Sequence, residues 1–195
     1  MAAPGCYPTA SILALEPLVR NGLVSDEDIV IVAFSGTSGA GRKTTTNLLG
    51  SEVMGAAAAY SVGGAHRHTP EIEQGTKAAV SFTPVLAPMP RGILATCTAR
   101  LAEGTTENDL REALSYQHEP FVHLLPTGQW PVTKNTAGSN AAHLQVTADH
   151  HAGRAISISA IDNLGKGAAG QAVQIANLML GLPETAGLTP HGVAP

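Results

Sequence analysis

The chain has 195 residues, which is enough for one well-packed domain or at most two small ones. It is 44% hydrophobic and 13% charged, with 21 glycines and 13 prolines, which is typical of a soluble globular protein with many turns and excludes a disordered chain. The net charge of −4 excludes a basic surface for nucleic acid, and no apolar run is long enough to predict a membrane span.

The first half of the chain predicts short helices and strands joined by glycine-rich turns. Pro8 suits the first turn of a helix, which continues along an apolar face and can end at Gly22. The run at 29–35 is apolar and rich in β-branched residues, so we expect a strand there. The other elements expected in this half are a loop at 35–42, a helix at 44–54, a strand at 58–62 and a helix capped by Thr69.

The second half predicts mostly strands. Two apolar runs, 80–88 and 91–101, read as neighbouring strands, and an amphipathic helix with a threonine cap is expected at 105–117. A mixed order of elements, rather than a regular βαβ repeat, favours an α+β domain on a mostly antiparallel or mixed sheet. The remaining elements expected are a strand at 120–125, a hairpin of 145–148 with 154–162, and a helix at 168–180.

Two glycine-rich segments are similar to nucleotide-binding loops. In GTSGAGRKT, Arg42 takes the lysine position of a phosphate-binding loop and Lys43 displaces the hydroxyl that binds magnesium. Such a turn can still hold a phosphate through its backbone N–H groups. The glycines of GKGAAG at 165–170 match GxGxxG, but too few residues follow for a dinucleotide-binding unit. They are better explained as glycines that let a helix begin close to another surface.

The two cysteines differ in their surroundings. Cys97 lies in an apolar strand-like run, so we expect a buried, inert thiol. Cys6 stands before a predicted helix, where free N–H groups would stabilise the thiolate. A lowered pKa predicts that iodoacetamide labels Cys6 well below about pH 8 and faster than Cys97. Two cysteines without a CxxC pair are typical of reduced thiols in the cytoplasm.

The bases that could serve this thiol lie in the segment HRHTPE. On an extended chain His66 and His68 point the same way, and Arg67 points the other way. A thiolate that attacks and an imidazole that moves protons are what acyl transfer through a thioester requires. Two alternatives stay open: a zinc site built from these and other histidines, and a structural role for either histidine singly.

The chain resembles the N-acetyl-γ-glutamyl-phosphate reductase family along essentially its whole length. The motifs, in the family's order, are MAAPGCYPTASILALEP, SGTSGAGR, HRHTPEIEQ, FTPVLAP with RGILATCTA, GSNAAH, and DNLGKGAAGQAVQ with NLMLGLPET. The resemblance implies a catalytic domain like that of glyceraldehyde-3-phosphate dehydrogenase, with a mixed, largely antiparallel sheet and helices packed on one face.

The resemblance also implies an activity: the family reduces N-acetyl-γ-glutamyl phosphate to the semialdehyde with NADPH and releases phosphate, in arginine biosynthesis. It implies that Cys6 is the nucleophile that forms the thioacyl intermediate, and that His68 is the general acid and base, with His66 as its competitor. No metal is implied. The further residues implied are Ser35, Gly36, Arg42, Arg67 and Glu71 for the substrate, and Asn163, Lys166 and Gly167 for the cofactor.

Members of this family begin with an NADP-binding Rossmann domain, which this sequence does not show. We therefore expect residues 1–195 to be the catalytic and oligomerisation domain of a longer cytoplasmic enzyme. Its C-terminal helix at 165–181 would normally dock on the cofactor domain and here expose Val173, Leu178 and Leu180. We expect the chain alone not to bind NADPH.

The expected partners follow from the same resemblance. They are a small acyl phosphate, further copies of the chain in a dimer or tetramer, and, as one route to activity, a separate Rossmann-domain chain; neither nucleic acid nor a membrane is expected. Two other functions remain open. One is a truncated assembly module without redox activity, and the other is a hydrolase that uses the cysteine and histidine without a cofactor.

Overall fold

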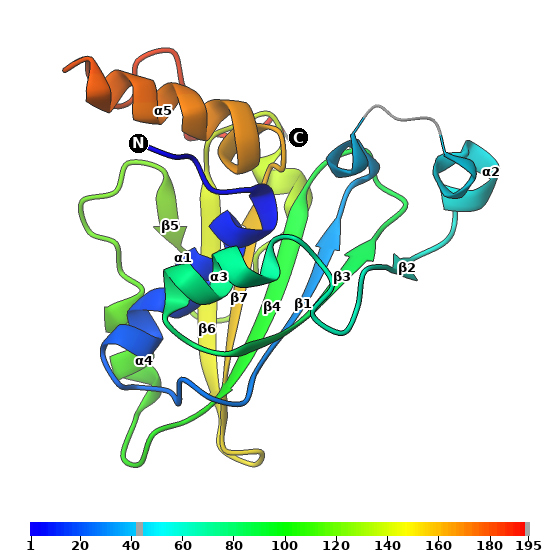
Figure 1. Cartoon of the computed structure of the whole chain (residues 1–195). Helices are drawn as coiled ribbons and strands as arrows, with labels where there is room; N and C mark the ends of the chain where they lie inside the picture. The colour runs from blue at the N-terminus through cyan, green and yellow to red at the C-terminus, as the bar shows by residue number, and fades with distance from the viewer. Residues whose placement is uncertain (42–44, 194–195) are drawn as a thin grey trace.

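Seven strands form one mixed sheet in the computed structural model, which describes residues 1–41 and 45–193 (Figure 1). Their order across the sheet is β2-β3-β1-β4-β7-β6-β5. The pairs β1/β3 and β5/β6 are parallel and the others are antiparallel, which confirms the expected fold class. The strands are β1 (Ile29–Ser35), β2 (Ala58–Ala59), β3 (Val80–Leu86), β4 (Ile93–Arg100), β5 (Val122–Leu124), β6 (Ala142–Asp149) and β7 (Arg154–Ile161).

Three helices cover one face of this sheet, and a fourth lies across its end (Figure 1). The covering helices are α1 (Cys6–Arg20), α3 (Thr69–Thr76) and α4 (Glu107–Ala113). The helix α5 (Gly170–Met179) crosses the end of the sheet after a π-helical turn, η4 (Gly165–Ala169). None of the helices formed by the described residues is both long and apolar enough to cross a bilayer.

The core lies between α1 and the centre of the sheet. Strand β4 buries every second residue, and Cys97 is one of these, fully buried as predicted. Burial raises the pKa of the Cys97 thiol, so this side chain behaves as an apolar one. On α1, Ala10 and Ala14 are fully buried. Small side chains at these positions let the helix backbone approach β4 and β7 closely.

The other face of the sheet is only partly covered. Because side chains alternate along a strand, Val32 and Phe34 of β1 and Ile156 of β7 point away from α1. These side chains are half-buried, and Val30 beside them is 36% exposed. The sheet therefore presents an apolar surface on the side opposite the helices.

The region before α3 departs most from the predicted elements. The helix predicted at 44–54 is wrong: the described part contains a short 3-10 helix, η2 (Thr46–Leu48), and a single turn, α2 (Gly50–Val53). Leu49 between them is extended, with φ −65° and ψ 146°, which breaks the helical path. The strand predicted at 58–62 is only the two-residue β2. The residues 42–44 lie outside the described part of the chain.

Helix boundaries shift by a few residues elsewhere, most at the end of the helix predicted at 105–117, which stops at Ala113. Helix α1 begins at Cys6 itself, so Pro8 lies inside its first turn. Helix α3 begins at Thr69, and the residue at its N-cap is His68 rather than the predicted Thr69. Helix α4 starts after Thr106, whose hydroxyl accepts from the Asp109 amide while the Asp109 carboxylate accepts from the Thr106 amide. The threonine cap expected there is confirmed.

Candidate active site

Cys6 is the first residue of α1, and it lies half-buried where three parts of the chain meet. Gly5 is the N-cap, and its carbonyl accepts the first helical hydrogen bond, from the Thr9 amide over 2.9 Å. Burial raises the pKa of the Cys6 thiol, whereas the N–H groups of Tyr7 and Cys6 and the charge of Arg67 lower it. The net direction is upward, so the sequence-based prediction of a lowered pKa is wrong. Loss of water outweighs the helix start.

His68 lies directly against Gly5, the residue that precedes Cys6. A Cβ atom on Gly5 would stand 2.5 Å from Nε2 of His68, so only glycine permits this approach of the imidazole. The His68 ring is 8% exposed, and its Nδ1 is buried without a hydrogen-bond partner among the described residues. Of the two predicted bases, His68 is therefore the one whose ring the structure brings against the Gly5–Cys6 segment.

His66 supports His68 rather than replacing it. The segment is a turn and not an extended strand, so the predicted alternation is wrong, yet the two rings lie side by side with centroids 4.9 Å apart. Nδ1 of His66 accepts a hydrogen bond from the His68 amide over 3.1 Å. Burial lowers the pKa of His68 to about 4, and burial also lowers the pKa of His66. Both imidazoles are therefore neutral at pH 7.

Two tyrosines that the sequence did not single out complete this cluster. The Tyr7 and Tyr60 hydroxyls are 3.0 Å apart, and both rings meet the His66 ring edge to face. Burial raises the pKa of both phenols, so each stays protonated and can donate a hydrogen bond. Tyr7 directly follows the candidate nucleophile Cys6 in the sequence, a signal that could have identified it.

Glu71, predicted to bind substrate, contacts the backbone just before Cys6, and its substrate role stays a prediction. Its Oε1 accepts a hydrogen bond from the Gly5 amide over 2.9 Å. Arg67 is exposed, and its charge lowers the pKa of the Cys6 thiol and of His68. Substrate binding by Arg67 stays a prediction, and its position near both groups is compatible with that role.

Ser35 and Gly36, also predicted to bind substrate, are buried at the end of β1. The Ser35 hydroxyl donates to the Gly36 carbonyl over 3.0 Å. A Cβ on Gly36 would stand 2.7 Å from the Arg91 Cα, so Gly36 allows two backbone segments to touch. Both residues are committed to internal contacts here, and their substrate role stays a prediction. Arg42 lies outside the described residues.

The residues predicted to bind the cofactor face inward. Asn163 accepts from the Gly92 amide over 2.7 Å and donates to the Ser38 hydroxyl over 3.0 Å. Lys166 is 6% exposed, and its ammonium donates to Oε1 of Gln174 over 2.7 Å. As placed here, neither side chain offers a free group to a dinucleotide.

The glycines of the GxGxxG segment allow close packing, as expected from the sequence. A Cβ on Gly167 would stand 2.7 Å from the Cβ of Cys6. A Cβ on Gly165 would stand 2.1 Å from the Ser139 carbonyl oxygen, and one on Gly170 would stand 2.5 Å from Oδ1 of Asn140. The turn η4 therefore lies against both Cys6 and the loop at 138–140.

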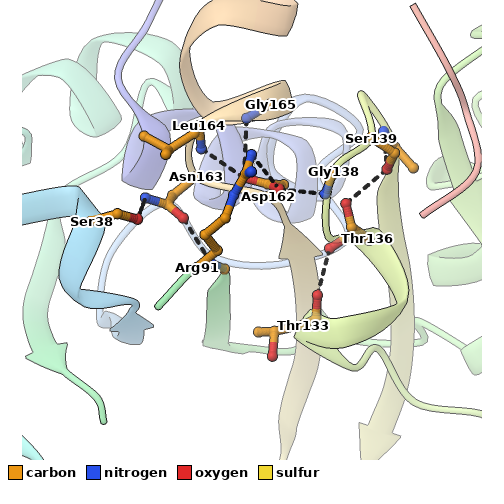
Figure 2. A network of polar contacts seen from close by, with 12 residues as sticks. Ser38, Arg91, Thr133, Thr136, Gly138, Ser139, Asp162, Asn163, Leu164 and Gly165 are labelled. Carbon is orange, nitrogen blue, oxygen red and sulfur yellow. Dashed lines mark hydrogen bonds and ion pairs between the residues drawn. The ribbon is translucent and has the colours of Figure 1, made fainter. Parts of the chain in front are cut away.

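A buried carboxylate, Asp162, ties the loops around this site together (Figure 2). It is fully buried, and Arg91 pairs with it through Nε at 3.1 Å and Nη2 at 2.8 Å. The Gly138 amide donates to its Oδ2, and the amides of Leu164 and Gly165 donate to its Oδ1. The sequence analysis missed this pair. In the described part of the chain, no three histidine, cysteine or acidic side chains gather as metal ligands.

Comparison with known proteins agrees with this architecture. A family model described as "Semialdehyde dehydrogenase, dimerisation domain" matches residues 6–163. Proteins named N-acetyl-gamma-glutamyl-phosphate reductase from Frankia casuarinae and Acidothermus cellulolyticus are 61% and 60% identical to the chain, and they match all of it. The chain spans 59% of the length of each of these curated relatives. The resemblance recognised in the sequence is thereby confirmed.

Solved structures show the same fold at low identity. Aspartate semialdehyde dehydrogenase II from Vibrio cholerae superposes with a TM-score of 0.71 at 18% identity, over 91% of this chain and 61% of its own. Aspartate semialdehyde dehydrogenase from Francisella tularensis gives a TM-score of 0.70 at 14% identity, over 91% of this chain and 64% of its own. The mixed sheet with helices on one face is thus an arrangement that these structures share.

Proposed function

The chain belongs to the semialdehyde dehydrogenase dimerisation-domain family, and from that premise we propose that it is the catalytic part of an N-acetyl-γ-glutamyl-phosphate reductase. The proposed reaction reduces the acyl phosphate to N-acetyl-glutamate semialdehyde with NADPH and releases phosphate, in arginine biosynthesis. The observation that carries the proposal is the contact of the His68 imidazole with Gly5, next to a thiol at the start of a helix. The names of the full-length relatives supply the substrate.

In the proposed acyl-transfer step, Cys6 loses its proton to Nε2 of His68 and the sulfur attacks the carbonyl carbon. A carbon–sulfur bond forms, the bond from that carbon to the phosphate oxygen breaks, and phosphate leaves with the electron pair. Since burial raises the thiol pKa and lowers that of His68, both groups rest in the neutral form. A bound anionic substrate would favour the imidazolium and so promote proton transfer when it is needed.

The residues predicted to bind NADPH do not fit that role as they are placed. Asn163 and Lys166 bind internal partners with their polar groups, and Gly167 is buried against Cys6. The thioester formed on Cys6 would need a hydride and a proton to give the aldehyde. NADPH held by a cofactor domain outside these residues would supply the hydride.

The surface of α5 supports the docking of such a domain. The helix buries three amide side chains and leaves apolar ones outside, the reverse of an ordinary surface helix. As the sequence predicted, Val173 is 42%, Leu178 49% and Leu180 73% exposed. The full-length relatives contain further residues that could cover this side, since the chain spans 59% of their length.

We further propose that the chain forms homo-oligomers through the open face of the sheet. That face carries half-buried apolar side chains from β1 and β7, and the matching family model is described as a dimerisation domain. An assembly module without redox activity is the alternative function that this surface favours.

The reductase assay in the phosphate-driven direction tests the proposed function. N-acetyl-glutamate semialdehyde, phosphate and NADP⁺ are supplied to the chain alone, and to the chain mixed with the N-terminal part of the Frankia casuarinae relative. We expect NADPH formation in the mixture and none with Cys6→Ser. A mixture that binds tightly and yet stays inactive would favour the assembly module.

A second assay tests whether the chain is a hydrolase that acts through Cys6 without a cofactor. Release of nitrophenol from nitrophenyl acetate is compared between the native chain and Cys6→Ser. Equal rates for the two exclude hydrolysis by this thiol, whereas loss of the reaction in the variant supports it.

A further inference from the structure

The peptide bond between Pro4 and Gly5, just before the nucleophile, is held at both ends. The Gly5 amide donates to Oε1 of Glu71 over 2.9 Å, and the Pro4 carbonyl accepts from Nε2 of Gln171 over 3.3 Å. The N–H and C=O of a trans peptide point in opposite directions, so the two partners approach from opposite sides. Glu71 belongs to α3 and Gln171 to α5.

The same glutamine also contacts the first turn of α1. Its Nε2 lies 3.3 Å from the Thr9 hydroxyl oxygen, and that hydroxyl donates to the Gly5 carbonyl over 2.9 Å. The shorter contact assigns the single Thr9 hydroxyl hydrogen to Gly5, so the two N–H bonds of the Gln171 amide serve Pro4 and Thr9, and Oε1 of Gln171 lies 3.3 Å from the same hydroxyl oxygen. Both Gln171 and Thr9 are nearly fully buried, at 8% and 4% exposure.

These bonds fix the backbone plane from which Cys6 departs. Gly5 has little space to move, because the His68 ring packs directly against it. The next residue, Cys6, is likewise confined, because Gly167 packs against its Cβ. The N–H groups of Cys6 and Tyr7, which stabilise the thiolate, follow directly from this peptide plane. If the plane rotates, these N–H groups turn away from the sulfur.

We propose that Gln171 is a positioning residue for the Cys6 nucleophile, acting through the Pro4–Gly5 peptide and Thr9. This inference rests on the proposed function, because only there is Cys6 the attacking group. The inference links α5 to the nucleophile. A cofactor domain that docks on the exposed apolar side of α5 would act on the thiol through Gln171, on the buried side of the same helix. The position of α5 thereby sets how well the thiolate is stabilised.

The test measures the pH dependence of Cys6 alkylation by iodoacetamide in the chain itself, followed by mass spectrometry. Gln171→Met removes both N–H donors with little change in volume, and Thr9→Val removes only the hydroxyl. Gln174→Met is the matched control, since Gln174 is an equally buried amide one turn further along α5 that contacts Lys166 and Asn140 instead. The charged groups near the thiol, Arg67 and Glu71, and the neutral imidazole of His68 are left unchanged in all these variants.

We expect the alkylation profile of Gln171→Met and of Thr9→Val to move to higher pH by about half a unit or more, with the control at the wild-type position. Profiles that coincide with wild type in folded variants would overturn the inference, as would an equal shift in the control. If Gln171→Met fails to fold, the test uses two results together: the shifted profile of Thr9→Val and slow hydrogen exchange of the Gly5 amide in wild type. The readout needs neither acyl phosphate nor NADPH, so failure of the reductase assay would not be mistaken for failure of this link.

Discussion

Gly167 stands against Cys6 so closely that a methyl group on the glycine would lie 2.7 Å from the Cβ of the cysteine. The Gly167 amide donates to the Asp162 carbonyl over 2.9 Å, so the backbone at this contact is itself fixed from the end of β7. The fixed Gly167 backbone therefore blocks movement of Cys6 toward η4. The position of Cys6 thus depends on Gly167, a glycine far away in the sequence.

Gly167→Ala is accordingly expected to displace Cys6 and to lower the rate of NADPH formation in the reconstituted assay by about 100-fold, because misplacement of a reacting group by about 1 Å is that costly. The binding of the cofactor part should be retained. Gly50→Ala is the control, since the nearest atom to its added Cβ is the Met54 sulfur at 3.9 Å. A Gly167→Ala variant as active as wild type would show that this contact does not position the thiol.

Alkylation of the two thiols should differ in pH dependence and in access. Burial raises the pKa of Cys6, so its labelling rate is expected to keep rising above pH 9.0, the ordinary thiol pKa, rather than to level off below it. Cys97 is fully buried and should stay unlabelled until the chain unfolds. Mass spectrometry of native samples labelled across this pH range checks both statements. A plateau for Cys6 near pH 7 would contradict the first.

Stability should fall on mild acidification because of His68. The pKa of His68 is about 4 in the folded chain and 6.5 for an ordinary histidine, the value expected in the unfolded chain. As the pH falls, the unfolded chain therefore takes up this proton before the folded chain does. The contribution of the neutral ring is complete above pH 6.5 and is lost as the pH falls from 6.5 toward 4, at most about 3 kcal/mol.

Urea unfolding at about pH 7.5 and at about pH 5 measures this loss in wild type and in His68→Gln. Carboxylates titrate in both proteins, so the difference between them isolates the histidine. The glutamine variant should lose less stability on acidification than wild type. Equal losses would mean that the folded ring accepts a proton as readily as the unfolded one.

Much of the site could be predicted from the sequence, because its key groups lie in short local motifs. Cys6 stands at a proline- and glycine-marked helix start, and the HRH segment precedes a helix with Pro70 in its first turn. The strands β1 and β4 follow from their apolar runs, although the continuous apolar run of β1 does not indicate which of its faces is buried. The local pattern could not show whether His66 or His68 lies beside Cys6. That depends on the turn that carries both histidines and on the close approach that Gly5 allows.

The rest depends on contacts between distant segments. The helix predicted at 44–54 fails where Leu49 turns extended, directly before Gly50, a helix-disfavouring residue that the prediction passed over. The expectation of a low thiol pKa considered the helix start and left out burial, which only the packed structure supplies. Asp162 and Arg91 are far apart in sequence, and each alone looks like an ordinary charged residue at a loop. Their pairing depends on β4 and β7 being neighbours in the sheet.

The Asp162 carboxylate should be worth far more to stability than any surface ion pair. It is fully buried and accepts from Arg91 and from three backbone amides, so replacing it with Asn leaves N–H donors without an anion. The Arg91 side chain is 41% exposed and can be solvated without its partner, so the loss comes from the buried amides, at about 1–3 kcal/mol for each donor left unsatisfied, whereas an exposed pair is worth about 0–1 kcal/mol. Urea unfolding of Asp162→Asn should show the larger loss, and Arg20→Met, which breaks the exposed pair of Arg20 with Glu16, should show almost none. Because Asp162 also anchors the loop that carries Gly167, the Asn variant should lose reductase activity in the reconstituted assay even at temperatures where it stays folded. Similar stability losses in the two variants would mean that the carboxylate is not the anchor of these loops.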